Sequence, residues 1–170
     1  MRAVVVYESM FGNTKQVAEA VAAGIAETMP VDLFEVGRAP TALKPDVGLV
    51  VIGAPTHAFS LSRPATRDEA AKRAPAGLVS PGIGAREWLG DLDIAPGTPT
   101  AAFCTRVKVV FAGSAAKAAA RLLRKARCTL AAPPKDFTVV GTPGPLAPGE
   151  LERARRWAGR LARAAACVPE

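Results

Sequence analysis

Short apolar runs rich in β-branched residues alternate with helical patterns along the chain, and this alternation restricts the fold more than any other feature. The runs at residues 2–7 and 47–54 are apolar on both faces, which is typical of central strands in a parallel sheet. Further strands are predicted at residues 31–36, 98–105 and 128–140, the last interrupted by two prolines. Helical periodicity predicts helices at residues 14–27, 67–73, 85–89, 114–127 and from residue 148 onward.

Strands that alternate with helices favour an α/β fold, in which a five-stranded parallel sheet carries helices on both faces. Neither a repeat nor a linker interrupts the pattern, so residues 1–170 are expected to form a single domain. In such sheets ligands bind beyond the carboxyl ends of the strands, where the strand order reverses. For this architecture that point lies between the first and third strands. The loops after Tyr7, Ala54 and Phe103 therefore form the candidate site.

The first of these loops, residues 8–14, has the composition of a phosphate-binding turn. Backbone N–H groups at the helix start, with the hydroxyls of Ser9 and Thr14 and the amide of Asn13, would donate to a phosphate without any fixed positive charge. Gly12 would let the backbone turn close to the anion. The alternative interpretation, left open by the sequence, is that Asn13 or Thr14 only caps the helix.

Several other kinds of site lack their signature. The chain has no GxGxxG and no GxxxxGK[ST] motif, which argues against dinucleotide and ATP sites. A phosphoacceptor receiver domain would need an Asp at the end of the third strand, where this chain has Gly53-Ala54-Pro55. One His and three Cys without a CxxC pair predict neither a metal site nor a disulfide framework. No apolar run approaches the length of a membrane span and no signal peptide is evident, so a cytoplasmic protein is expected.

The first two loops resemble the flavin-binding loops of the flavodoxin family. The family's phosphate loop is similar to Val5-Val6-Tyr7-Glu8-Ser9-Met10-Phe11-Gly12-Asn13-Thr14, and its second flavin loop to Gly53-Ala54-Pro55-Thr56-His57. The resemblance covers nearly the whole chain and implies the strand order 2-1-3-4-5 and an FMN cofactor. The FMN-binding residues that it implies are Ser9, Met10, Phe11, Gly12, Asn13, Thr14, Pro55, Thr56, His57, Phe59, Cys104, Thr105 and Arg106. No catalytic residue is expected, because the flavin carries the redox chemistry.

Three departures from the family pattern bear on the flavin. Met10 and Phe11 stand where typical flavodoxins have hydroxyl residues, so backbone groups would bind more of the phosphate. His57, with Phe59 two residues on, matches the aromatic residue that usually covers the flavin, and would add a pH dependence near its unperturbed pKa of ~6.5. The third loop, residues 104–108, lacks the usual acidic residues and Tyr. Arg106 would stabilise the reduced flavin if this loop lies against the pyrimidine edge, and would otherwise point to water.

The resemblance leaves three functions open. The first is an FMN-binding protein that transfers electrons between a reductase and an acceptor. The second is an oxidoreductase that acts directly on a quinone or porphyrinogen-type acceptor, and the third is a flavin-free binding module of the same fold. Residues 59–84 make a longer connection than a minimal flavodoxin needs. They would form either a flap at the exposed edge of the flavin or a solvated surface helix with local ion pairs.

Charge is distributed unevenly along the chain. The net charge is +7, and residues 94–134 contain seven basic residues and no acidic one. Four of these basic residues recur at helical spacing and so share one face of the helix predicted at 114–127, namely Lys117, Arg121, Arg124 and Lys125. A solvated face is one interpretation; the functional one is that segment 106–127 contacts an acidic redox partner protein or an anionic membrane surface. Nucleic acid is a poorer partner, because no aromatic residue interleaves with these charges.

Overall fold

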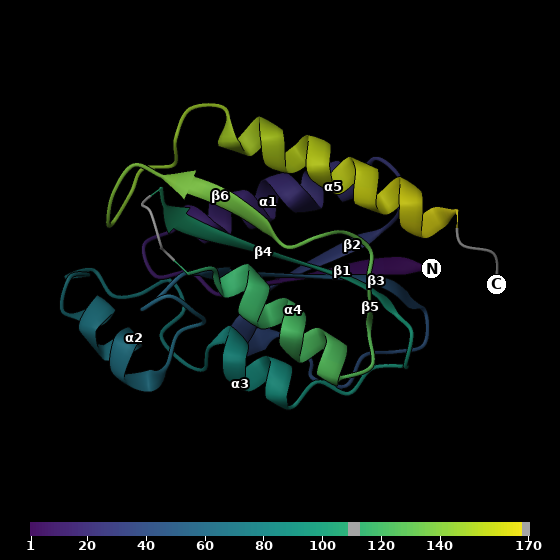
Figure 1. The fold of residues 1–170 in the computed structure, drawn as a ribbon, viewed down its shortest axis with the longest axis horizontal. Coiled ribbons are helices and arrows are strands. Elements are labelled where there is room, and N and C mark those ends of the chain that lie inside the picture. Colours follow the sequence, from purple (N-terminus) through teal and green to yellow (C-terminus); the bar gives the residue numbers. More distant parts are fainter. Residues whose placement is uncertain (109–112, 168–170) are drawn as a thin grey trace.

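The computed structural model describes residues 1–108 and 113–167, and it contains the predicted parallel sheet (Figure 1). Its strands are β1 (Arg2–Tyr7), β2 (Val31–Glu35), β3 (Val47–Pro55), β4 (Pro99–Val107), β5 (Thr129–Leu130) and β6 (Lys135–Val139). The order is β2-β1-β3-β4, and both β5 and β6 pair with β4 in parallel. The predicted order is therefore confirmed, and the predicted fifth strand consists of two short strands on either side of the prolines.

Helices cover both faces of the sheet, as predicted. They are α1 (Asn13–Ala26), α2 (Pro64–Ala71), α3 (Ala85–Gly90), α4 (Ala115–Lys125), α5 (Glu150–Ala166) and the 3-10 turn η1 (Val36–Arg38). Figure 1 shows α1 and α5 on one face and α3 and α4 on the other. Helix α2 lies at the end of the molecule toward which the arrowheads of β4 and β6 point. That end is the carboxyl edge of the sheet, so α2 stands next to the predicted site.

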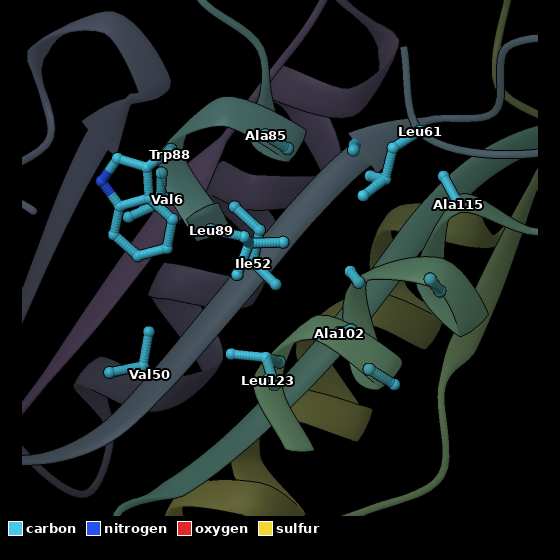
Figure 2. Close-up of a cluster of buried hydrophobic side chains, with 14 of the residues drawn as sticks. Val6, Val50, Ile52, Leu61, Ala85, Trp88, Leu89, Ala102, Ala115 and Leu123 are labelled. Carbon is cyan, nitrogen blue, oxygen red and sulfur yellow. The ribbon is translucent and has the colours of Figure 1, made fainter. Parts of the chain in front are cut away.

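The layer under α3 and α4 is one of two cores. Trp88 of α3 and Leu123 of α4 are fully buried and pack with Ile52 of β3 (Figure 2). The indole Nε1 of Trp88 donates to the carbonyl of Pro40 over 3.2 Å, so the one polar atom of this ring has a partner. The face of α4 that meets the sheet is mostly alanine, which lets the helix approach the strands closely.

The opposite layer, under α1 and α5, holds an aromatic cluster. The rings of Phe103, Phe137 and Trp157 meet edge to face, with centroids 5.8–6.2 Å apart, an arrangement favoured by the ring quadrupoles. At Gly24 the backbones of helices α1 and α5 are in direct contact, with no side chain between them. A Cβ atom built on Gly24 would lie only 2.2 Å from the backbone oxygen of Arg155.

Helix α4 begins as predicted and carries the predicted basic face. The hydroxyl of Ser114 at its N-cap accepts a hydrogen bond from the backbone N–H of Lys117 over 3.3 Å. The four basic side chains of this face are all exposed, and none has an ion-pair partner in the described part of the chain. Within residues 1–108 and 113–167, no helix is long and apolar enough to cross a bilayer, and no three metal-ligating side chains gather in one place.

Candidate functional site

The loops that follow β1, β3, β4 and β6 enclose a cleft at the carboxyl edge of the sheet. The predicted site residues in its lining are Ser9, Met10, Phe11, Asn13, Thr14, Pro55, Thr56, His57, Thr105 and Arg106. Three loops that are far apart in the sequence are thus brought together. The lining is completed by residues that were not predicted from the sequence, namely Val107, Val139 and residues 141–143.

The first loop presents backbone donors to this cleft. Gly12 has φ +98°, a left-handed conformation that glycine adopts without strain, and it is the N-cap of α1. The hydroxyl oxygen of Ser9 accepts from the backbone N–H groups of Gly12 at 3.1 Å and Lys15 at 3.3 Å. The N–H groups of Phe11, Asn13 and Thr14 have no hydrogen-bond partner among the described residues. Uncharged donors therefore converge where a helix starts, an arrangement suited to an anion.

The alternative that Asn13 or Thr14 merely caps α1 is wrong. Both residues lie inside the helix, and the cap residue makes no side-chain hydrogen bond. The Asn13 amide instead donates to the carbonyl of Pro143 over 2.5 Å. The Thr14 hydroxyl lies 2.8 Å from the hydroxyl of Thr105, and it is buried. Because two hydroxyls share only one hydrogen in such a pair, the other hydrogen stays available to a ligand.

The second loop is fixed to its neighbours through backbone bonds. The N–H of Thr56 donates to the carbonyl of Thr105 over 2.9 Å, and the Thr56 hydroxyl accepts from the N–H of Ala115. His57 and Ser60 exchange a pair of backbone hydrogen bonds that closes a tight turn. Burial lowers the pKa of His57 below its usual value. The imidazole is therefore neutral at pH 7, and the pH dependence expected near 6.5 moves to lower pH.

Three predicted residues do not line the cleft. Gly12 shapes the turn through its backbone conformation. Phe59 is 70% exposed at the tip of the second loop, where its backbone has φ +71° and contacts Gly113. Cys104 is fully buried in the core under α4. Successive side chains of a strand point to opposite faces, so Cys104 faces away from the side occupied by Thr105.

Arg106 in the third loop is paired with an acidic residue that comes from another strand. Asp136 of β6 lies 3.5 Å from Nη1 of Arg106, and the same guanidinium donates to the carbonyl of Gly113. Asp136 also accepts from the hydroxyl of Ser114 at 2.7 Å and from the thiol of Cys104 at 3.1 Å. Burial raises the pKa of Cys104, so the thiol stays protonated at pH 7. The acidic residue that residues 104–108 lack is therefore supplied by β6, which pairs with β4 and brings a carboxylate alongside Arg106.

The connection at residues 59–84 is anchored to the sheet by a buried polar network. Arg67 of α2 is only 9% exposed and donates to Ser62 and to both carboxylate oxygens of Glu87. The fully buried Glu8 carboxylate accepts from the Ser62 hydroxyl and from the N–H of Ala85. Burial raises the pKa of Glu8. The solvated-helix interpretation holds for the exposed side of α2 but not for Arg67.

The same connection also pairs with the first loop. The N–H of Ser9 donates to the hydroxyl of Ser80 over 3.0 Å, and the N–H of Ser80 donates back to the carbonyl of Ser9 over 2.8 Å. The N–H of Val79 donates to the carbonyl of Met10. Residues 59–84 are therefore held to the first loop at two places, rather than attached only through their ends.

Two parts of the site were missed by the sequence analysis. The first is Asp136, which gave no local signal because its partners lie in other elements. The second is the stretch Gly141-Thr142-Pro143, which comes one residue after the carboxyl end of β6. This stretch lies at the carboxyl end of the last strand, which is also where ligands bind in such sheets.

No protein-family model matches the sequence, and no curated protein sequence matches it either. The structure is similar to that of a flavodoxin from the domain Archaea, with a TM-score of 0.70 and 20% identity over 98% of this chain and 99% of that one. It is similar to oxidised flavodoxin 1 from Bacillus cereus, with a TM-score of 0.69 and 14% identity over 96% and 98% of the two chains. It is also similar to part of rubredoxin oxygen:oxidoreductase from Desulfovibrio gigas, with a TM-score of 0.63 and 19% identity. That match covers 97% of this chain and 36% of the other. The chain therefore has the flavodoxin-like fold.

Proposed function

We propose that this protein binds FMN in the cleft and transfers electrons between a reductase and an acceptor. The observation that carries the proposal is the turn around Gly12, where the N–H groups of Phe11, Asn13 and Thr14 have no partner among the described residues. A phosphate ester is the chemical group that such a turn at a helix start recognises. The flavodoxins among the similar structures support the choice of a flavin phosphate.

The rest of the cleft offers groups that can hold the remainder of FMN. Thr56, His57 and Thr105 line it with two hydroxyls and an imidazole whose pKa is lowered by burial. Arg106 is paired with Asp136, so the lining carries little net charge. Bound FMN would supply the redox chemistry, while these residues hold it and set the charge around it.

The test is to titrate the flavin-free protein with FMN and with riboflavin, following flavin fluorescence. FMN is expected to bind far more tightly, because hydrogen bonds to a charged phosphate are the strong ones. Thr14→Ala is expected to weaken FMN binding by roughly 1–3 kcal/mol and to leave riboflavin binding nearly unchanged. Thr28→Ala, which changes an exposed threonine near the far end of α1, is the control. Equal affinities for the two flavins would refute the phosphate site, and no binding of either would favour a flavin-free module.

The basic face of α4 supports an acidic protein partner for the proposed carrier. The face belongs to the predicted segment 106–127, of which residues 109–112 lie outside the described part. Exposed charges attract an acidic surface over ~8–10 Å at physiological ionic strength, and salt screens them. Reduction of bound FMN by an acidic reductase should therefore slow as salt rises, and Arg121→Glu/Arg124→Glu should slow it at low salt. Arg160→Glu/Arg163→Glu on the exposed side of α5 makes the same charge change on the other face of the sheet. A rate that neither salt nor the α4 variant alters would contradict this partner, and tight binding to anionic vesicles would point to a membrane surface.

A second candidate function is direct reduction of a small acceptor. It is favoured by one observation, a further cavity that adjoins the cleft on the side of α2. Turnover of a small acceptor by the flavin-loaded protein without a protein partner would distinguish this function from electron carriage.

A further inference from the structure

A second cavity of about 250 Å³ lies beside the cleft. Phe11, Thr56, His57 and Thr142 line both spaces, so the two adjoin along a shared wall. The opposite wall of the second cavity is α2 and the turn after it. Ligand pockets of drug-sized molecules hold roughly 300–1,000 Å³, so this cavity suits a molecule of one or two rings.

One face of α2 forms that wall, and the structure fixes its position. Thr66, Glu69 and Ala70 of α2 line the cavity together with Arg73 from the turn after it, and the spacing of the three α2 residues places them on one side of the helix. The neighbouring position Arg67 is buried and holds α2 to Glu87 and Ser62, as described above. The wall is therefore a preformed surface rather than a loose loop.

The chemistry of the cavity favours an aromatic anion. The ring of Phe11 and the methyl groups of Ala58 and Ala70 give the lining an apolar part, against which an aromatic ring can pack. Glu69 is paired with Lys72 at 2.5 Å. Arg73 forms no ion pair in residues 1–108 and 113–167, although its charge helps to lower the pKa of the Glu69 carboxyl. Because Glu69 is already paired with Lys72, the guanidinium of Arg73 leaves a net positive charge at the rim.

We propose that this cavity binds a planar aromatic carboxylate of one or two rings, with the carboxylate on Arg73 and the ring toward Phe11 and His57. A guanidinium and a carboxylate match in geometry as well as charge. The role of this ligand as an electron acceptor rests on the proposed function, whereas the site itself does not. A quinone that carries a carboxylate would then take two electrons and two protons from reduced FMN and leave as the hydroquinone, while the flavin returns to its oxidised state.

The experiment measures binding by calorimetry, with 2-naphthoate as the anionic probe and 2-naphthamide as its neutral match. Naphthoate is expected to bind wild type about tenfold more tightly than naphthamide, a factor typical of one charged contact. Arg73→Gln is expected to remove that difference and to leave naphthamide binding unchanged. Arg63→Gln changes an exposed arginine at the opposite end of α2 that lines neither space, and it should keep the preference for naphthoate. Each titration is repeated on protein saturated with FMN, and naphthoate is expected to bind there without displacing the flavin.

The outcomes separate this site from the proposed function. If FMN binds but naphthoate does not, or if Arg73→Gln leaves the preference for naphthoate intact, the aromatic carboxylate site is refuted while FMN binding stands. Displacement of FMN by naphthoate would also refute it, because the ligand would then occupy the cleft itself. If naphthoate binds with the expected dependence on Arg73 but FMN does not bind, the site stands and the acceptor role fails with the proposed function.

Discussion

Replacing Gly24 by alanine should destabilise the fold, because two helices meet at this residue with no room for a side chain. The Cβ atom would lie 2.2 Å from the backbone oxygen of Arg155 and 3.1 Å from the Cβ of Ala158. A comfortable contact needs about 3.4 Å, so α1 and α5 would have to separate locally by ~1 Å. A backbone oxygen inside a helix cannot rotate out of the way as the end of a side chain can.

The expected cost follows from two opposing effects. Overpacking of a close-packed interface costs typically about 1–3 kcal/mol, and the upper end is expected here because the obstacle is backbone. Alanine regains up to about 1 kcal/mol through its better helix propensity. The net loss in the free energy of unfolding is therefore about 1–2 kcal/mol.

Gly159 on α5 provides the matched control. A Cβ atom there would meet only the guanidinium of Arg163 at 3.4 Å and the backbone oxygen of Gly24 at 3.6 Å, which are ordinary contacts. Gly159→Ala should thus be neutral or stabilise by up to about 1 kcal/mol. Urea unfolding followed by circular dichroism measures both variants. A Gly24→Ala protein as stable as wild type, or the opposite ranking of the two variants, would refute the close approach of these helices.

Further predictions concern titration and charge. Burial acts to raise the pKa of Glu150, but the hydrogen bonds from the Arg153 side chain and the Thr138 N–H outweigh it, and the pKa is lowered. A lowered folded-state pKa contributes stability that is present above the unfolded value of ~4.3 and is lost as the pH falls through the folded value. Glu150→Gln should therefore cost about 1–2 kcal/mol at pH 7 and much less near pH 3, and an equal cost at both pH values in urea unfolding would contradict this. In the FMN-loaded protein, Arg106→Gln should make reduction of the flavin harder and Asp136→Asn should make it easier, each by at most on the order of 100 mV. Potentiometry tests this, and shifts of the same sign would show that the pair does not act on the flavin through its charges.

The sheet and the first loop could be predicted because their signals are local. The runs at residues 2–7 and 47–54 are apolar on both faces, and the glycine before α1 marks a tight turn whatever surrounds it. The surroundings of Arg67 could not be predicted in this way. Its sequence neighbours are those of a solvated helix, and its ion-pair partner Glu87 lies in a different helix, α3.

The same limit applies to the charge at the third loop. Arg106 lies in a segment without acidic residues, so the sequence shows no partner for it nearby. Asp136 reaches it only because β6 takes the position next to β4 beyond a pair of prolines. Unlike helical or strand periodicity, a contact between two distant elements cannot be recognised from the residues that neighbour it in the sequence.

Because Val79 and Ser80 pair with the first loop, hydrogen exchange at their backbone amides should report on the cleft, although both residues lie outside it. Their amide hydrogens can exchange with deuterium only when their bonds to Met10 and Ser9 open. A ligand that holds the first loop closed must therefore slow exchange at both amides, although neither residue lines the cleft. Deuterium uptake at these two positions would report occupancy of the loop by any phosphate ester, whether or not the ester absorbs visible light.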